Sequence, residues 1–195
     1  MFFHGKNQEL IMSEIIADLP KTSGNPNGLY VTKKLLSLTL KVGYEDYKPQ
    51  VVNIMTKNAI EMVQNPYGNY AIQIVLDTYS PSLISGIIEA IKGRVSNLCL
   101  IKFSSNVIER CIEKAAGKLK EELIRELMDS DNLFGIMKNR FGSYVVQKAL
   151  AFAEPRLRME FKEKLQSILL SENRKRKIVT SKGADSTSEP DFQIN

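Results

Sequence analysis

The chain has 195 residues, of which 43% are hydrophobic and 25% are charged, and its formal net charge is +5 at pH 7. This composition is ordinary for a soluble globular protein with a sizeable core, and no apolar run is long enough to cross a bilayer. The first residues do not form a secretory signal peptide. We therefore expect no membrane partner, whereas the mild positive charge permits a polyanionic partner without requiring one.

Helical periodicity dominates along the chain and strand signals are weak. The segment Asn7–Leu19 places Leu10, Ile11, Ile15 and Ile16 on one face of a helix. Pro81 and Pro155 stand at first helical positions, where proline is favoured. The same apolar spacing recurs in four later segments: QVVNIMTKNAIEMV, SLISGIIEAI, KEELIRELM and RMEFKEKLQSILL. The sequence therefore predicts an all-α protein.

Three segments align with one another without gaps: PYGNYAIQIVL (66–76), KFSSNVIERCI (102–112) and RFGSYVVQKAL (140–150). Their first polar positions, Asn69, Ser105 and Ser143, are separated by 36 and 38 residues. NGLYVTKKLL (27–36) fits more loosely, with Leu29 at this position. A helical repeat of this length predicts an armadillo-like, right-handed α-solenoid, in which each repeat buries its apolar face by stacking on its neighbours.

We expect this repeat domain to cover residues 1–172. The remaining residues, 173–195, are poor in apolar side chains and include the basic run Arg174–Lys177. Their composition predicts a disordered basic and polar tail. The two cysteines, Cys99 and Cys111, lie among apolar residues and are predicted to be core thiols. They favour a reduced, cytoplasmic protein, and the basic run leaves a nuclear or nucleolar location open.

Within each aligned segment, polar residues four apart lie on the same side of the helix, because the helix repeats every 3.6 residues. The residue after the first polar one points about 100° around the helix and has a flat face. We call each such trio a rung. The three rungs are Asn69, Tyr70 and Gln73; Ser105, Asn106 and Glu109; and Ser143, Tyr144 and Gln147. A rung can meet the edge of a planar heterocycle with its outer two residues and the face of that heterocycle with its middle residue.

The three segments resemble the repeats of the Pumilio (PUF) family, which bind single-stranded RNA with one base per repeat. The resemblance covers residues 66 to about 170 well and residues 7–65 loosely. It implies contact with RNA by all nine rung residues, with uracil read by Asn69 and Gln73. RNA runs antiparallel to the repeats in this family, so the implied core is 5′-(A/U)-G-U.

The resemblance implies guanine for Ser105 and Glu109, because a carboxylate only accepts hydrogen bonds and guanine presents two adjacent donors. Ser143 and Gln147 resemble an adenine-type pair. The last repeat of the family usually has Asn where Ser143 stands and reads uracil, so adenine and uracil both remain open there.

Weaker RNA contacts are expected from Tyr30, Lys33 and Arg110. Tyr30 can stack and Lys33 can reach a phosphate, whereas Leu29 in the loose fourth segment cannot bond to a base edge. We therefore expect little base specificity there. Arg110 follows the guanine rung and is expected to be a surface charge or a stacking helper.

Family resemblance further implies binding to messenger RNA 3′ untranslated regions, with translational repression or decay, and protein corepressors on the outer surface. We expect a monomer without cofactors. Two alternatives remain: a nucleolar Pumilio-like protein with low base specificity, and a HEAT- or armadillo-type scaffold for proteins. An enzyme is the least supported class, because His4 is the only histidine and the sequence has no metal-ligand cluster or phosphate-cradling glycine loop.

Overall fold

The structure is a computed structural model that describes residues 6–184, with side chains described for residues 9–174. In this part of the chain all regular secondary structure is helical. The helices are α1 (Lys6–Ala17), α2 (Leu19–Ser23), α3 (Pro26–Leu38), α4 (Tyr47–Lys57), α5 (Ala59–Gln64), α6 (Gly68–Thr78), α7 (Pro81–Ile91), α8 (Val95–Leu98), α9 (Lys102–Lys114), α10 (Gly117–Met128), α11 (Leu133–Lys138), α12 (Gly142–Phe152) and α13 (Pro155–Ala184).

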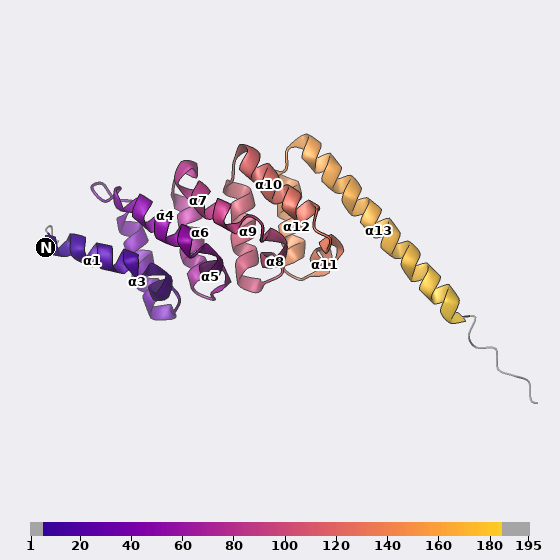
Figure 1. Ribbon diagram of the computed structural model, residues 1–195, viewed down its shortest axis with the longest axis horizontal. Coiled ribbons are helices and arrows are strands. Elements are labelled where there is room, and N and C mark those ends of the chain that lie inside the picture. Colours follow the sequence, from indigo (N-terminus) through magenta and orange to yellow (C-terminus); the bar gives the residue numbers. More distant parts are fainter. Residues whose placement is uncertain (1–5, 185–195) are drawn as a thin grey trace, which may run out of the picture.

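After α1, the helices form four repeats of three, each with a short first helix, a middle helix and an outer helix (Figure 1). The repeats are α2–α4, α5–α7, α8–α10 and α11–α13, numbered 1 to 4 below. Each of the middle helices α3, α6, α9 and α12 packs on the next, and the outer helix α4 packs on α7. Helix α1 packs on α4 and so takes the place of an outer helix at the N-terminal end of the stack. The predicted all-α solenoid is confirmed.

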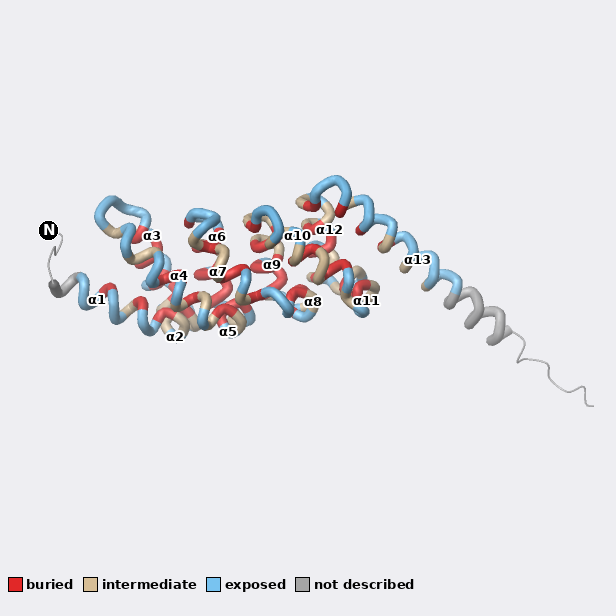
Figure 2. Tube along the Cα trace, turned by 45° about the horizontal axis from the view of Figure 1, so that its top comes forward, coloured by how far each residue is buried: buried red, intermediate tan, exposed pale blue. Residues whose placement is uncertain are grey.

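A continuous apolar layer between the middle and outer helices holds the repeats together (Figure 2). On α9, for example, Val107, Ile108, Cys111 and Ile112 are all inaccessible to solvent. Full burial of an aliphatic side chain of this size contributes about 1.5–3 kcal/mol. Because these positions recur at helical spacing in every repeat, stacking removes from water the faces that one repeat alone would expose.

An asparagine organises the start of the middle helix in three of the four repeats. The Asn65 side-chain oxygen accepts hydrogen bonds from the backbone N–H groups of Tyr67 and Gly68, both at 2.8 Å. Asn139 does the same in repeat 4, and Asn25 accepts from Gly28 in repeat 1. These bonds satisfy donors that a helix N-terminus leaves unpaired. They fix the residue at which each middle helix begins, and hence where its rung lies.

The residue just before each rung packs closely on the carbonyl six positions earlier. At Gly142 an added Cβ would lie 2.7 Å from the Ile136 carbonyl oxygen, so a larger residue would displace the backbone. Repeat 3 has Ser104 at this position, and its hydroxyl donates a 2.6 Å hydrogen bond to the Leu98 carbonyl. In repeat 3 a hydrogen bond from the serine hydroxyl therefore takes the place of the close contact between the glycine and the carbonyl. The rung of repeat 3 begins at the same position relative to that carbonyl as in the other repeats.

Helix α13 continues to Ala184, past the predicted domain end at residue 172 (Figure 1). The expectation of disorder from residue 173 is wrong for 173–184, and residues 185–195 lie outside the described part. The physical reason is local: no glycine or proline interrupts the chain between Pro155 and Gly183, and leucine, glutamate, lysine and arginine favour helix. Low apolar content alone did not predict the end of this helix.

No helix in the described residues combines the length and apolar character needed to span a bilayer. Cys99 and Cys111 are both buried and unbonded to each other, as expected of core thiols. Burial raises the pKa of each thiol to about 12, so both are protonated near neutral pH.

Thr32 on α3 is fully buried, and its hydroxyl has no hydrogen-bond partner among the described residues. Repeats 2 to 4 have Ile72, Ile108 and Val146 at the equivalent position. Thr32→Val keeps the shape of the side chain and removes an unpaired polar group. We expect the free energy of unfolding to rise by about 1 kcal/mol, measured by chemical denaturation.

Thr39→Val is the matched control, because the Thr39 hydroxyl is also buried but donates to the Leu36 carbonyl and accepts from the Tyr79 hydroxyl, both at 2.7 Å. This change should lower the free energy of unfolding by about 1–3 kcal/mol. A loss of stability in both variants would contradict the account of Thr32.

Candidate nucleic-acid interface

The middle residues of the three rungs occupy equivalent positions on α6, α9 and α12, which pack on one another in this order. Tyr70 is 50% exposed and Tyr144 is 61% exposed, and Asn106 between them is also exposed. Tyr30 on α3 extends this row and is 64% exposed. Flat side chains that are exposed at one equivalent position of successive helices provide a series of faces on which bases can stack.

In repeat 2 the first residue of the rung is buried and fixed. The Asn69 side chain is 1% exposed, and its amide donates to the carbonyls of Asn65 and Pro66 at 2.8 and 2.9 Å. Its oxygen accepts a 2.9 Å hydrogen bond from the Gln73 amide. The expected alignment of positions four apart is therefore present, but only Gln73 is accessible. From the sequence we expected the side-chain amides of both Asn69 and Gln73 to meet the edge of a base. In the structure the buried Asn69 instead orients Gln73 through this hydrogen bond.

Repeat 3 shows the same division between its two edge residues. Ser105 is 2% exposed, and its hydroxyl donates to the Lys102 carbonyl at 3.2 Å. The Asn106 amide reaches the same carbonyl at 3.4 Å while remaining exposed. Glu109 is half-buried, so its carboxylate is the hydrogen-bond acceptor of this rung that remains accessible to a ligand.

Glu109 lies in a partly desolvated, charged environment. Burial raises the pKa of its carboxyl above the ordinary value, and the Glu113 charge acts in the same direction. The positive charges of Lys148 and Arg110 counteract this effect. A carboxylate with reduced hydration is a strong acceptor for a donor that reaches it, because less water competes for its lone pairs.

Repeat 4 has the most open rung, with Tyr144 and Gln147 exposed and Ser143 half-buried. In repeat 1, Leu29 is buried and offers no group to a base, as predicted. The Lys33 ammonium lies over the ring of Tyr70, 5.8 Å from its centroid, and Lys34 lies at the same distance over Tyr30. Repeat 1 thus contributes aromatic and cationic groups without an edge-reading pair.

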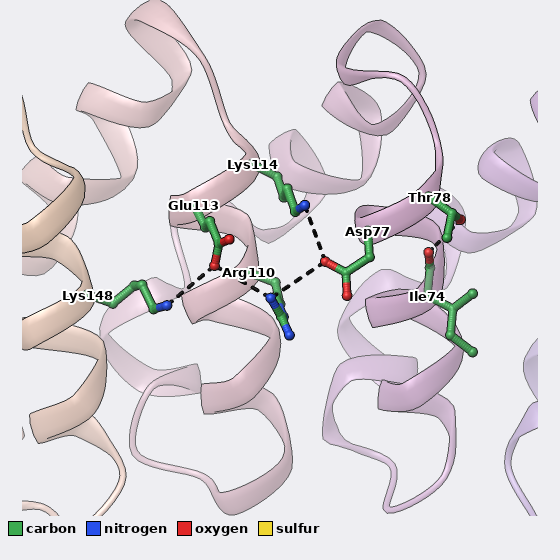
Figure 3. Close-up of polar contacts among 7 residues, drawn as sticks. All are labelled: Ile74, Asp77, Thr78, Arg110, Glu113, Lys114 and Lys148. Atoms are coloured by element: carbon green, nitrogen blue, oxygen red, sulfur yellow. Dashed lines mark hydrogen bonds and ion pairs between the residues drawn. The ribbon is translucent and has the colours of Figure 1, made fainter.

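Ion pairs join the C-terminal halves of α6, α9 and α12 (Figure 3). Asp77 pairs with Arg110 and Lys114 of the next repeat at 3.7 and 3.5 Å, and Glu113 pairs with Lys148 of the repeat after that at 3.3 Å. Arg110 also lies 3.6 Å from Glu113. The weaker RNA contact expected of Arg110 remains a prediction, and the structure shows that its charge is shared by two carboxylates.

Sequence reasoning missed these ion pairs, because the partners are 33 to 37 residues apart and no local pattern links them. It also missed the asparagine at the start of the middle helices. A signal for that residue was present, because Asn-x-x-Gly occurs at 25–28, 65–68 and 139–142. That motif supports the register already assigned to the loose first segment from the sequence, although it also occurs at 132–135, where α11 begins.

These features define an α-helical repeat protein with a periodic polar and aromatic surface. Residues 58–92, 98–128 and 132–160 match the Pumilio-family RNA binding repeat, in agreement with repeats 2, 3 and 4. A Pumilio domain-containing protein of Schizosaccharomyces pombe is 38% identical over 122 residues, which are 63% of this chain and 18% of that protein. Pumilio homolog 12 of Arabidopsis thaliana is 34% identical over 111 residues, which are 56% of this chain and 19% of that protein.

Solved structures show the same fold. PUF-8 in complex with PBE-RNA matches with a TM-score of 0.75 at 17% identity, over 87% of this chain and 48% of that one. A Puf4 double mutant bound to the Cox17 RNA 3′ UTR recognition sequence matches with a TM-score of 0.74 at 16% identity, over 97% of this chain and 64% of that one. The chain belongs to the Pumilio family of RNA-binding repeat proteins. It spans about a fifth of the two curated relatives and about half to two thirds of these solved domains.

Proposed function

We propose that this chain binds single-stranded RNA along its row of rungs and selects the sequence 5′-(A/U)-G-U. The observation that carries the proposal is the row of exposed flat side chains Tyr70, Asn106 and Tyr144, each beside an accessible Gln73, Glu109 or Gln147. Stacking of a base on an aromatic side chain contributes roughly 1–3 kcal/mol, and the edge residue then distinguishes one base from another.

The choice of guanine at the middle position depends on Glu109. Its carboxylate can accept from both the N1–H and the exocyclic amine of guanine, whereas adenine, cytosine and uracil do not present two adjacent donors. Gln73 can donate and accept and therefore suits uracil. Gln147 beside Ser143 suits adenine, with uracil as the other family assignment.

The natural ligands that this proposal implies are messenger RNAs, bound in their 3′ untranslated regions in the cytoplasm, with repression or decay as the outcome. The RNA-bound relatives support it, since a recognition sequence from a 3′ UTR is bound by the Puf4 mutant. Protein corepressors would bind the outer helices of a monomeric solenoid.

Fluorescence anisotropy with short RNAs tests the proposal. An oligonucleotide that contains UGU should bind more tightly than one in which the G is replaced by A, C or U. Equal affinity for all four would refute base reading and favour a low-specificity RNA binder. A failure to bind any RNA would favour a protein scaffold.

The preference for guanine should depend on pH in a direction set by Glu109. Its pKa is raised, so its carboxylate becomes protonated at a higher pH than an exposed glutamate. Protonation replaces an acceptor with a donor, and the ratio of affinities for G and A should therefore fall as the pH is lowered from neutral into the acidic range. In Glu109→Gln the ratio should be independent of pH over this range. A ratio that is equally pH-dependent in both proteins would show that another group is responsible.

A further inference from the structure

Repeats 3 and 4 each have a basic residue at two equivalent positions, one at or just before the start of the middle helix and one within it. Lys102 and Arg140 stand three residues before the first residue of their rung. Arg110 and Lys148 stand five residues after it. The two pairs have the same charge and the same repeat spacing, but their surroundings differ.

The cations of the later pair form ion pairs within the protein, where they and Lys114 share the carboxylates of Asp77 and Glu113 (Figure 3). Arg110 lies within 3.7 Å of Asp77 and within 3.6 Å of Glu113, and Lys148 donates to Glu113 at 3.3 Å. A phosphate that approached here would meet two carboxylates as well as the cations. The C-terminal halves of α6, α9 and α12 are therefore a poor path for an RNA backbone.

The earlier pair is oriented without being neutralised. The Lys102 ammonium lies 5.5 Å from the centroid of the Phe103 ring, and the Arg140 guanidinium lies 4.6 Å from that of Phe141. Both cations are exposed, and no carboxylate of the described residues forms an ion pair with either. A contact with an aromatic face restricts a cation while leaving its charge available.

Lys102 is also joined directly to the guanine rung. Its carbonyl accepts hydrogen bonds from the Ser105 hydroxyl and the Asn106 amide, so its side chain begins beside the residues proposed to bind the base. Arg140 stands three residues before Ser143, as Lys102 stands three residues before Ser105. The turn at Asn139, whose side chain accepts from the Phe141 and Gly142 N–H groups, fixes the backbone around Arg140.

We propose that Lys102 and Arg140 bind successive phosphodiesters of the RNA, so that its backbone passes the N-terminal side of the rungs. Arg110 and Lys148 instead hold neighbouring repeats together, and for Arg110 this role replaces the weak RNA contact expected from the sequence. This inference rests on the proposed function and adds the path of the backbone to it. It also assigns phosphate binding to two residues outside the nine that form the rungs.

Four variants that each remove one positive charge test the proposal: Lys102→Gln, Arg140→Gln, Arg110→Gln and Lys148→Gln. The affinity for a UGU-containing RNA is measured from about 50 to 200 mM salt. Each phosphate contact to a single strand contributes about 0.7 to the slope of log K against log salt. The slope should become shallower by about this amount in each of the first two variants and should not change in the other two.

The ratio of wild-type to variant affinity for Lys102→Gln or Arg140→Gln should accordingly be about 2.6 times smaller at about 200 mM salt than at about 50 mM salt. The preference for guanine should not change. Thermal unfolding of each variant checks that the fold is retained. Equal changes of slope in all four variants would overturn the proposal, because net charge alone would then explain them. Unchanged slopes in all four, with guanine preference intact, would overturn the backbone path but not the proposed function. A wild-type protein that binds no RNA would overturn both.

Discussion

Replacing Glu109 with glutamine should reduce the preference for guanine over adenine by about 1–3 kcal/mol, which is roughly a 5- to 150-fold change in relative affinity. A glutamine amide presents one acceptor and a pair of donors where the carboxylate presents acceptors alone, so one of the two guanine donors loses its partner. The rung would then carry the same edge pair as Ser143 with Gln147. Affinity for an RNA with adenine at the middle position should therefore rise.

Competition binding with RNAs that differ only at the middle base measures this change. Glu113→Gln is the matched control, because it removes the same charge one turn further along α9, where Glu113 pairs with Lys148 rather than lying in a rung. Glu113→Gln should leave the base preference unchanged. The assignment of Glu109 to guanine would be refuted by an unaltered preference in Glu109→Gln, or by equal changes in both variants.

Phe161→Ala should lower the free energy of unfolding by about 3–5 kcal/mol, the cost of removing a large aromatic side chain from a closed core. Phe161 is fully buried on α13, with Leu157 and Leu165 one turn before and after it. Through this part of α13, the outer helix packs on α10, α11 and α12. No further repeat within the described residues covers this end, so α13 is the last helix that packs on α12, which also packs on α9 and α11.

The same variant should change RNA binding in a position-dependent way. In a solenoid each repeat is stabilised by its neighbours, so loss of packing at one end opens that end first. Hydrogen exchange should become faster in α12 before it does so in α6, and selection of the base before guanine should weaken first. Met159→Ala, two residues away at a position 64% exposed, should change stability by no more than about 0.5 kcal/mol. Comparable destabilisation by both variants would contradict this account of α13.

Much of the fold follows from local pattern. The apolar spacing of segments such as KFSSNVIERCI is enough to predict a helix, because burial of one face requires a period near 3.6 residues. The recurrence of aligned segments every 36 to 38 residues is enough to predict a solenoid, because every repeat must bury its face against a neighbour. Those two periodicities also place Tyr70, Asn106 and Tyr144 at one equivalent position.

The accessibility of individual side chains did not follow from these patterns. Asn69 and Ser105 share a side of the helix with Gln73 and Glu109, yet they are buried, because the first turn of each middle helix lies against the chain that enters it. Sequence spacing gives direction around a helix axis but not depth below the surface. Depth depends on how the preceding segment packs.

The helical class, the number of well-formed rungs and the residue types in each rung all follow from the sequence alone. Which of those residues are accessible, and which cations are paired, depends on how the repeats pack on one another. Arg110 and Lys102 look equally available in the sequence, but contacts between repeats place Arg110 beside Asp77 and leave Lys102 over Phe103. The physical reason is that an ion pair depends on the distance between helices of different repeats, and the pattern of one repeat contains no information on that distance.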